Sequence, residues 1–270
     1  MVIGAENALY EIAEKKICYS DFVDALYTVG IEKGDTIFVH SDIAVFGKLA
    51  THDRKFLFDS LINAMKEVVG DKGNIIMPTF TYSFCKKEIF DVDNTPSTVG
   101  ALTDYFRKLP DVQRSVHPIF SVAVWGRDRE SLCNISKDSF GEDSIFDKLY
   151  KHKGKIVCFG APFLSITYIH YVEQKHGIPY RFIKKFKGII KNKDRSYEEE
   201  VGYFVRPLDK NIEIDANKLE EYFLSNNFLK KTRVGSGLIS LIDIKDYCDV
   251  GSKLLDKDVF YFLVSNHEFK

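Results

Sequence analysis

Short runs of apolar, mostly β-branched residues recur along this chain and alternate with longer segments that carry the apolar period of a helix. The runs are DTIFVH, NIIMPTF, IFSVAVW and KIVCF, at residues 35–40, 74–80, 119–125 and 155–159. The segments of helical period lie at residues 52–69, 97–109, 143–152 and 167–176. Strands that alternate with helices are typical of α/β domains, in which helices cover both faces of a sheet. The pattern therefore predicts a layered αβα sandwich around a mostly parallel central sheet.

The pattern changes in the last third of the chain. The stretch FKGIIKNKDRSYEEEVGYFVRPL reads as two strands joined by a charged turn, which predicts a small antiparallel β insert at about residues 185–207. Two helices, at 218–226 and 243–255, and a last strand at 258–264 are expected after it. The sequence has no internal repeat and no low-complexity linker, so we expect residues 1–270 to form one domain.

Charge and hydropathy exclude several classes of partner. The chain has 38 basic and 39 acidic residues and a formal net charge of -1, so no overall field attracts it to nucleic acid or to an anionic membrane. No run approaches the ~20 apolar residues that a membrane span needs, and the N-terminus lacks the regions of a signal peptide. The five cysteines are widely spaced and include no C-x-x-C pair, which is typical of reduced thiols. We expect a cytoplasmic protein without nucleic-acid or membrane partners, and a homodimer is left open.

The stretch SITYIHYVEQKHG, residues 165–177, places two histidines and a glutamate three residues apart on a predicted helix. Residues at this spacing share a helix face, so His170, Glu173 and His176 form one stripe. A zinc-binding helix carries its histidines four residues apart, and a di-iron site needs a second Glu-x-x-His, so we expect no metal. A histidine held by a carboxylate is suited to general base catalysis, which favours the pair His170 and Glu173. The spacing alone also fits an ordinary helix in which His170 packs and Glu173 is solvated.

The ends of two predicted strands and one loop supply further candidates. Ligands of open α/β sheets bind beyond the carboxyl ends of the strands, which favours the segment HSD at residues 40–42 and Thr79 at the end of the next strand. The loop RSVHPIFS, residues 114–121, combines a cation with two hydroxyls and a histidine, which suits an anionic cofactor. A plain strand cap and a turn with a surface arginine explain the same residues without a ligand, and the sequence leaves both explanations open.

Seven segments run in order through most of the chain and match one pattern of motifs. They are GDTIFVHSDI, GNIIMPTFTYSF, NTPSTVGALTDYFRKLP, RSVHPIFSVAVWG, FGEDSIFDKLYKHKGKIVCFG, TYIHYVEQKHGIPYR and RVGSG. Together they resemble the aminoglycoside 3-N-acetyltransferases, also called the antibiotic N-acetyltransferase family. Several motifs in the same order are more specific than any one of them. The resemblance implies an enzyme that transfers an acetyl group from acetyl-coenzyme A to an amine of an amino-sugar acceptor.

The resemblance also implies where the two substrates bind. Catalytic roles fall to His170, Glu173 and Thr167. The cofactor is expected along two segments, at the positions His40, Ser41, Asp42, Arg114, Ser115, Val116, His117 and Ser121. The acceptor is expected near Thr79, Asp91, Glu142 and Asp143, and an acidic rim around a cationic acceptor is expected from Asp42, Asp91, Asp93, Glu142 and Asp143. Scattered acidic residues are also what an ordinary solvated surface contains.

Direct transfer in a ternary complex is the expected mechanism, because the sequence offers no activated cysteine or serine nucleophile. His170 would take a proton from the acceptor's ammonium, and Thr167 or backbone N–H groups would donate hydrogen bonds to the oxyanion. Asp42 departs from the family, whose members commonly carry a small hydroxyl there, and this departure bears on the acceptor. Two alternatives stay open: the same chemistry on a nucleotide-linked or glycan amino sugar, and a protein that binds cofactor or sugar without turnover.

Overall fold

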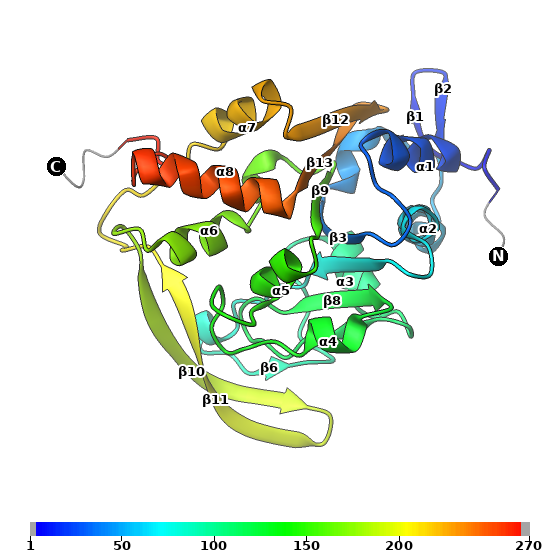
Figure 1. Ribbon diagram of the computed structural model, residues 1–270. Helices are drawn as coiled ribbons and strands as arrows, with labels where there is room; N and C mark the ends of the chain where they lie inside the picture. The colour runs from blue at the N-terminus through cyan, green and yellow to red at the C-terminus, as the bar shows by residue number, and fades with distance from the viewer. Residues whose placement is uncertain (1–3, 266–270) are drawn as a thin grey trace.

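A seven-stranded mixed sheet forms the centre of the computed structural model, which describes residues 4–265 (Figure 1). Its strands lie in the spatial order β12 (Leu229–Val234), β13 (Gly237–Asp243), β9 (Lys155–Phe159), β3 (Thr36–Ser41), β5 (Asn74–Pro78), β8 (Val122–Gly126) and β7 (Gln113–Arg114). β9, β3 and β5 pair in parallel, and the other pairs in this sheet are antiparallel. The parallel part therefore lies at the middle of the sheet, around β3.

Side chains that alternate along the central strands enter two cores, one on each face of the sheet. Ile37 and Val39 of β3 pack in one core, and Phe38 between them packs in the other. The first core is closed by helices α1 (Tyr19–Thr28), α2 (Arg54–Val69) and α3 (Ala101–Phe106). The second is closed by α4 (Arg129–Cys133), α5 (Ile145–Lys151), α6 (Ile169–His176), α7 (Ala216–Ser225) and α8 (Ile244–Lys257). None of these helices, which belong to residues 4–265, is long and apolar enough to cross a membrane.

Two smaller sheets flank the central one. The first is formed by β2 (Lys15–Cys18), β1 (Ala8–Ile12) and β4 (Lys48–Leu49). The second consists of the antiparallel hairpin β10 (Phe182–Asn192) and β11 (Arg195–Val205) together with β6 (Phe90–Asp91). Figure 1 shows the hairpin as a long ribbon that curves along the lower edge of the molecule. Short 3₁₀ helices lie in the connections, namely η1 (Ile43–Phe46), η2 (Phe84–Lys86) and η3 (Phe163–Ser165).

Local sequence sets the ends of several helices. Asp53 and Ser144 precede α2 and α5, and their side chains accept hydrogen bonds from the N–H groups of Phe56 and Asp147. These caps satisfy N–H groups that have no partner inside a helix. α6 ends at His176, and Gly177 after it has a φ of 78°, which is open to glycine and strained for other residues.

The predicted α/β fold, with helices on both faces and a small antiparallel insert, is confirmed. The parallel part is narrower than expected, because the chain after β5 returns beside it: the N–H of Thr79 bonds to the carbonyl of Ser121, and β8 runs antiparallel to β5. The strand predicted at 258–264 is wrong. That segment forms turns, with one bridge between Ile214 and Leu263, because its apolar residues are buried by loop packing rather than by sheet pairing. The β1–β2 hairpin, α1 and the β12–β13 pair were not predicted.

Candidate active site

His170 and Glu173 lie on the first turns of α6, three residues apart on one face of the helix. The Nδ1 atom of His170 is 2.6 Å from Oε2 of Glu173. An ionised carboxylate only accepts hydrogen bonds, so this contact places the proton of a neutral imidazole on Nδ1 and leaves the lone pair of Nε2 free. The side chain of His170 is 20% exposed, and that of Glu173 is fully buried. A buried carboxylate thus holds a reachable imidazole in one orientation.

Three neighbours keep Glu173 ionised. The hydroxyl of Tyr180 donates to Oε1 at 2.9 Å, and His170 bonds to Oε2. The Nε atom of Arg181 lies 2.9 Å from Oε2, a charge contact whose N–H is not aligned as a hydrogen bond. Burial by itself raises the pKa of Glu173, but the charge and hydrogen bond of His170, the charge of Arg181 and the Tyr180 hydroxyl outweigh burial. The pKa of Glu173 is therefore below its ordinary value. Tyr180 and Arg181 were not among the predicted site residues.

Three histidines from separate parts of the chain meet one aromatic cluster, which consists of Phe38, Phe120, Phe140 and Phe146. The ring contacts are His40 with Phe38, His117 with Phe120 and His170 with Phe140, at centroid distances of 4.8, 6.2 and 5.6 Å. These phenylalanines belong to the core that α5 and α6 close. The structure therefore brings three of the predicted segments together near the carboxyl end of β3.

His40 and His117 are buried in their neutral forms. The Nδ1 atom of His117 accepts hydrogen bonds from the N–H groups of Ile119 and Phe120, so its proton is on Nε2. Burial lowers the pKa of His117 to about 3 and that of His40 to about 4. Among residues 4–265, the Nε2 atoms of both rings and the hydroxyl of Ser41 have no hydrogen-bond partner. Each is a buried polar group that the fold leaves unsatisfied, which is unusual in a folded protein.

Arg114 was expected to bind a phosphate, but its guanidinium is used within the protein. Nη1 donates to the carbonyl oxygens of Val92 and Thr95, and Nη2 donates to that of Thr79. Nε points to the hydroxyls of Thr79 and Ser121, each at 3.2 Å. Burial lowers the pKa of Arg114 to about 10. These contacts tie its loop to the end of β5 and argue against the expected phosphate contact.

The other hydroxyls of this region also serve the fold. Ser115 accepts the N–H of Val122 at 2.9 Å, and the hydroxyl of Ser121 donates to the carbonyl of Thr79 at 2.7 Å. Val116 between them is only partly buried. The structure thus gives Thr79, Ser115 and Ser121 internal partners, which argues against the direct ligand contacts expected of them.

Replacing Arg114 with methionine is expected to lower the free energy of unfolding by about 2–3 kcal/mol, because buried carbonyl oxygens lose their donor. The measurement is denaturation with urea. The matched control is Arg129→Met, since that guanidinium makes one exposed hydrogen bond, to the carbonyl of Asp111. Equal losses in both variants would show that the buried network around Arg114 contributes nothing to stability.

Thr167 lies next to the base. Its carbonyl oxygen accepts the N–H of His170 at 3.1 Å. Its hydroxyl is 3.4 Å from the carbonyl of Ser165, which is a weak contact that leaves the O–H available. Thr167 and His170 both line a cavity of about 130 Å³, whose other walls are apolar residues of η3, α6, α7 and α8 and the chain before α7. The structure therefore brings the predicted oxyanion donor and the predicted base together.

Two residues of the expected acidic rim make contacts within the protein itself. Asp42 is exposed and accepts the N–H of Ala44 at 3.2 Å, so it caps η1. Asp91 bonds to the side-chain amide of Asn94 and to Lys191, and these contacts lower the pKa of Asp91 to about 2. The carboxylate of Asp91 is therefore already paired, which argues against a role in binding a cationic acceptor.

Two further acids of the expected rim, Glu142 and Asp143, lie before α5. Asp143 forms an exposed ion pair with Lys151 at 3.1 Å. Glu142 lines an open groove of about 410 Å³ together with Phe140, the residue whose ring contacts His170. Of the predicted acids, Glu142 is thus the one that lines a groove together with a residue in ring contact with His170.

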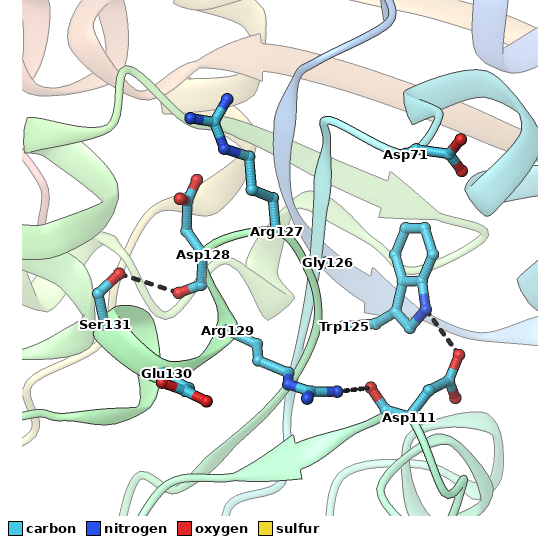
Figure 2. A pocket seen from close by; sticks show the side chains of 9 residues that line it. All are labelled: Asp71, Asp111, Trp125, Gly126, Arg127, Asp128, Arg129, Glu130 and Ser131. Carbon is cyan, nitrogen blue, oxygen red and sulfur yellow. Dashed lines mark hydrogen bonds between the residues drawn. The ribbon is translucent and has the colours of Figure 1, made fainter.

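A larger pocket, of about 620 Å³, lies at the other end of the central strands, away from the carboxyl end of β3 (Figure 2). It surrounds Gly126, the last residue of β8, which pairs with Asn74 at the start of β5. Some of its polar groups bond to one another: the indole of Trp125 donates to the Asp111 carboxylate at 2.7 Å, and Arg129 donates to the Asp111 carbonyl. This pocket is at the amino ends of the parallel strands and contains none of the predicted site residues.

His176, the last member of the predicted stripe, does not join the other two. Its Nε2 atom is 3.1 Å from Oδ1 of Asp256, at the end of α8. Within the described part of the chain, no group of three or more His, Cys, Asp and Glu side chains is placed to hold a metal ion. The histidine stripe thus divides into the His170–Glu173 pair and a separate contact of His176 with the end of α8.

Comparisons with known proteins point to one family. A sequence model of the aminoglycoside 3-N-acetyltransferases matches residues 38–256. The chain is similar to the SPbeta prophage-derived aminoglycoside N(3')-acetyltransferase-like protein YokD of Bacillus subtilis (strain 168), with 27% identity over 253 residues, 84% of this chain and 88% of that protein. It is similar to aminoglycoside N(3)-acetyltransferase III of Serratia marcescens, with 26% identity over 174 residues, 57% of this chain and 63% of that protein. The fold is similar to that of AAC-IIIb in its binary structure with CoASH, with a TM-score of 0.78 at 21% identity over 92% of this chain and 98% of that one.

Proposed function

Because this chain belongs to the aminoglycoside 3-N-acetyltransferase family, it is an acetyl-coenzyme A-dependent N-acetyltransferase, and we propose that His170 is the general base of direct acetyl transfer to an amino-sugar acceptor. The observation that carries this proposal is the 2.6 Å contact between Nδ1 of His170 and the buried carboxylate of Glu173. This contact orients the imidazole and leaves Nε2 for a proton from the acceptor.

The acceptor's amine is an ammonium at neutral pH and must lose a proton before it attacks a thioester. Nε2 of His170 takes this proton, and Glu173 stabilises the resulting imidazolium. The nitrogen then bonds to the acetyl carbon, the carbon–sulfur bond breaks, and the sulfur leaves with the electron pair and takes up a proton. The amide keeps one ammonium proton, the thiol takes one, and one goes to solvent. The hydroxyl of Thr167 is the proposed donor to the oxyanion.

The cysteines support direct transfer rather than an acetylated enzyme. A thiol must be deprotonated to act as a nucleophile. Burial raises the pKa of Cys133, Cys158 and Cys248 to about 12 in each case. These three thiols stay protonated at neutral pH, so none of them is suited to carry the acetyl group.

Unpaired polar atoms near the base suit acetyl-coenzyme A. They are Nε2 of His40, Nε2 of His117 and the hydroxyl of Ser41, all buried. The pantetheine arm of the coenzyme carries amide and hydroxyl groups, which need such partners when they leave water. We propose these three residues as cofactor contacts, in place of Arg114, Ser115 and Ser121.

The acceptor is proposed to be an aminoglycoside, a sugar with several ammonium groups. The groove beside Phe140 supports this acceptor, because Glu142 there has its carboxylate exposed and Phe140 adjoins His170. The exposed carboxylate of Asp42 is a second anionic group beyond β3. Lys151 and Lys175 line the same groove, and Lys151 is paired with Asp143 and Asp147, so the groove presents charges of both signs.

Purified protein is expected to release thiol from acetyl-coenzyme A when an aminoglycoside is added, with a product one acetyl group heavier by mass spectrometry. Free amino sugars and their nucleotide conjugates form the comparison panel. Turnover of the nucleotide conjugates alone would show that the proposed acceptor is wrong. Binding of the coenzyme in calorimetry, without thiol release for any acceptor, would contradict the proposed activity.

A further inference from the structure

The contacts around Glu173 act on the proton of His170 in opposite directions. The carboxylate favours an imidazolium because its charge is opposite and its Oε2 is 2.6 Å from the ring. Arg181 places a positive charge 2.9 Å from the same oxygen, and its side chain is 7% exposed. Tyr180, also buried, donates to the other oxygen and disperses part of the negative charge. The base is therefore held by a carboxylate whose charge is already partly balanced.

Arg181 changes the net charge that results when His170 takes up a proton. With His170 neutral, Glu173 and Arg181 form a pair without net charge. Proton uptake then gives the group a charge of one positive unit in a buried place, which is unfavourable. Without the guanidinium, neutral His170 and ionised Glu173 would carry one negative charge together, and the same proton would neutralise it. Arg181 therefore opposes proton uptake, whereas Glu173 favours it.

Other titratable groups face Glu173 or its partners, but they do not supply the positive charge that Arg181 places beside the carboxylate. They are Tyr203 on β11 and Arg206 just after it, and Tyr247 on α8 and Asp258 just after that helix. Burial raises the pKa of both tyrosine hydroxyls, so they stay uncharged at neutral pH. Arg206 acts on Tyr203, and Asp258 acts on Tyr180, one group further from the carboxylate.

We propose that Arg181 and Tyr180 are positioning residues that weaken the hold of the His170–Glu173 pair on a proton and so favour release of the proton that His170 takes from the acceptor. The catalytic meaning of this inference rests on the proposed general-base role of His170. The charge balance itself is a property of the folded protein without substrates.

The test is an NMR titration of the imidazole nitrogens in the substrate-free protein, with the His170 signals identified by their loss in His170→Gln. Arg181→Met is expected to raise the pH midpoint of proton uptake by about one unit, because the opposing charge is gone. Tyr180→Phe is expected to raise it by about half a unit, and Glu173→Gln to lower it by about one unit. Arg181→Lys keeps the charge and is expected to stay near the wild-type midpoint.

Tyr168→Phe is the matched control. Tyr168 is as fully buried as Tyr180, but its hydroxyl donates to the carbonyl of Phe146 at 2.6 Å and not to Glu173. Loss of this hydroxyl is expected to leave the midpoint unchanged. An unchanged or lower midpoint in both Arg181→Met and Tyr180→Phe, in proteins that melt as folded domains, would overturn the inference.

Kinetics with one fixed acceptor give the second readout. In a plot of kcat/KM against pH, the acidic limb is expected to shift to higher pH in Arg181→Met, by the same number of pH units as the NMR midpoint. Failure of the two proposals can be told apart. A wild-type protein without acetyl transfer would refute the proposed function while the titration still decides on Arg181. Active enzyme whose midpoint ignores Arg181 and Tyr180 would refute only the inference.

Discussion

Replacing His170 with alanine is expected to lower kcat for acetyl transfer by about 10²–10⁴-fold, the usual contribution of a general base. Without an imidazole, the acceptor's ammonium loses its proton only to water, and few amines can attack. The fold is expected to persist, because the side chain is 20% exposed at the start of α6 and alanine favours a helix. The measurement is the initial rate of thiol release at saturating substrates, together with a thermal melt.

His176→Ala is the control for His170→Ala, since His176 is on the same helix and contacts Asp256 instead of Glu173. We expect its kcat to stay within about twofold of the wild type, because it does not touch the base. A His170→Ala enzyme that turns over at the wild-type rate would remove His170 from the mechanism. Equal losses in both variants would point to damage of α6 rather than to lost base catalysis.

Replacing Gly160 with alanine is expected to lower the free energy of unfolding by more than about 4 kcal/mol. Gly160 follows β9, and a Cβ atom there would lie 2.1 Å from the backbone oxygen of Asp42. The close approach is needed because Ser41 and Gly160 form a bridge that joins the ends of β3 and β9. The backbones at the ends of β3 and β9 would have to move apart, and His40 on β3 would move as well. Urea denaturation and near-ultraviolet circular dichroism measure the effect.

Gly177→Ala separates this clash from backbone strain. Gly177 has a φ of 78° and Gly160 a φ of 79°, but a Cβ at Gly177 meets nothing within 4 Å. The left-handed conformation alone costs about 1–2 kcal/mol for a residue with a Cβ. We expect Gly177→Ala to lose only that amount. Similar losses in both variants would mean that the strands tolerate a methyl group between them.

The features that sequence could predict are those that depend on local spacing. The apolar runs marked β3, β5, β8 and β9, because strands buried on both faces carry apolar residues at successive positions. The three-residue spacing of His170 and Glu173 predicted a shared helix face, and the structure has their side chains 2.6 Å apart. Short-range geometry of a helix is fixed by the backbone, so residue types and spacing were sufficient there.

The features that sequence missed depend on partners distant along the chain. Arg114 looked like a phosphate ligand because a cation stood among hydroxyls, but its acceptors Val92 and Thr95 belong to another loop. Tyr180 and Arg181 follow the end of α6, where the N–H groups of Gly177 and Ile178 return to the carbonyl of Glu173. That return of the chain was the available signal, since a helix that ends in a left-handed glycine sends the next residues back towards its last turn.

The pairing of β3 with β9 also sets how the molecule can be made. β3 ends at Ser41 and β9 begins at Lys155, so one edge of β3 stays without its neighbour while on the order of a hundred further residues are synthesised. A ribosome adds ~5–20 residues per second, which leaves the apolar edge TIFVH half covered for about ten seconds, with only β5 in place beside it. Parallel strands far apart in sequence also pair slowly. The nascent chain therefore passes through a stage in which the strand that bears His40 is open to aggregation. The yield of active enzyme is expected to depend on the temperature and on chaperones that bind the chain during that stage.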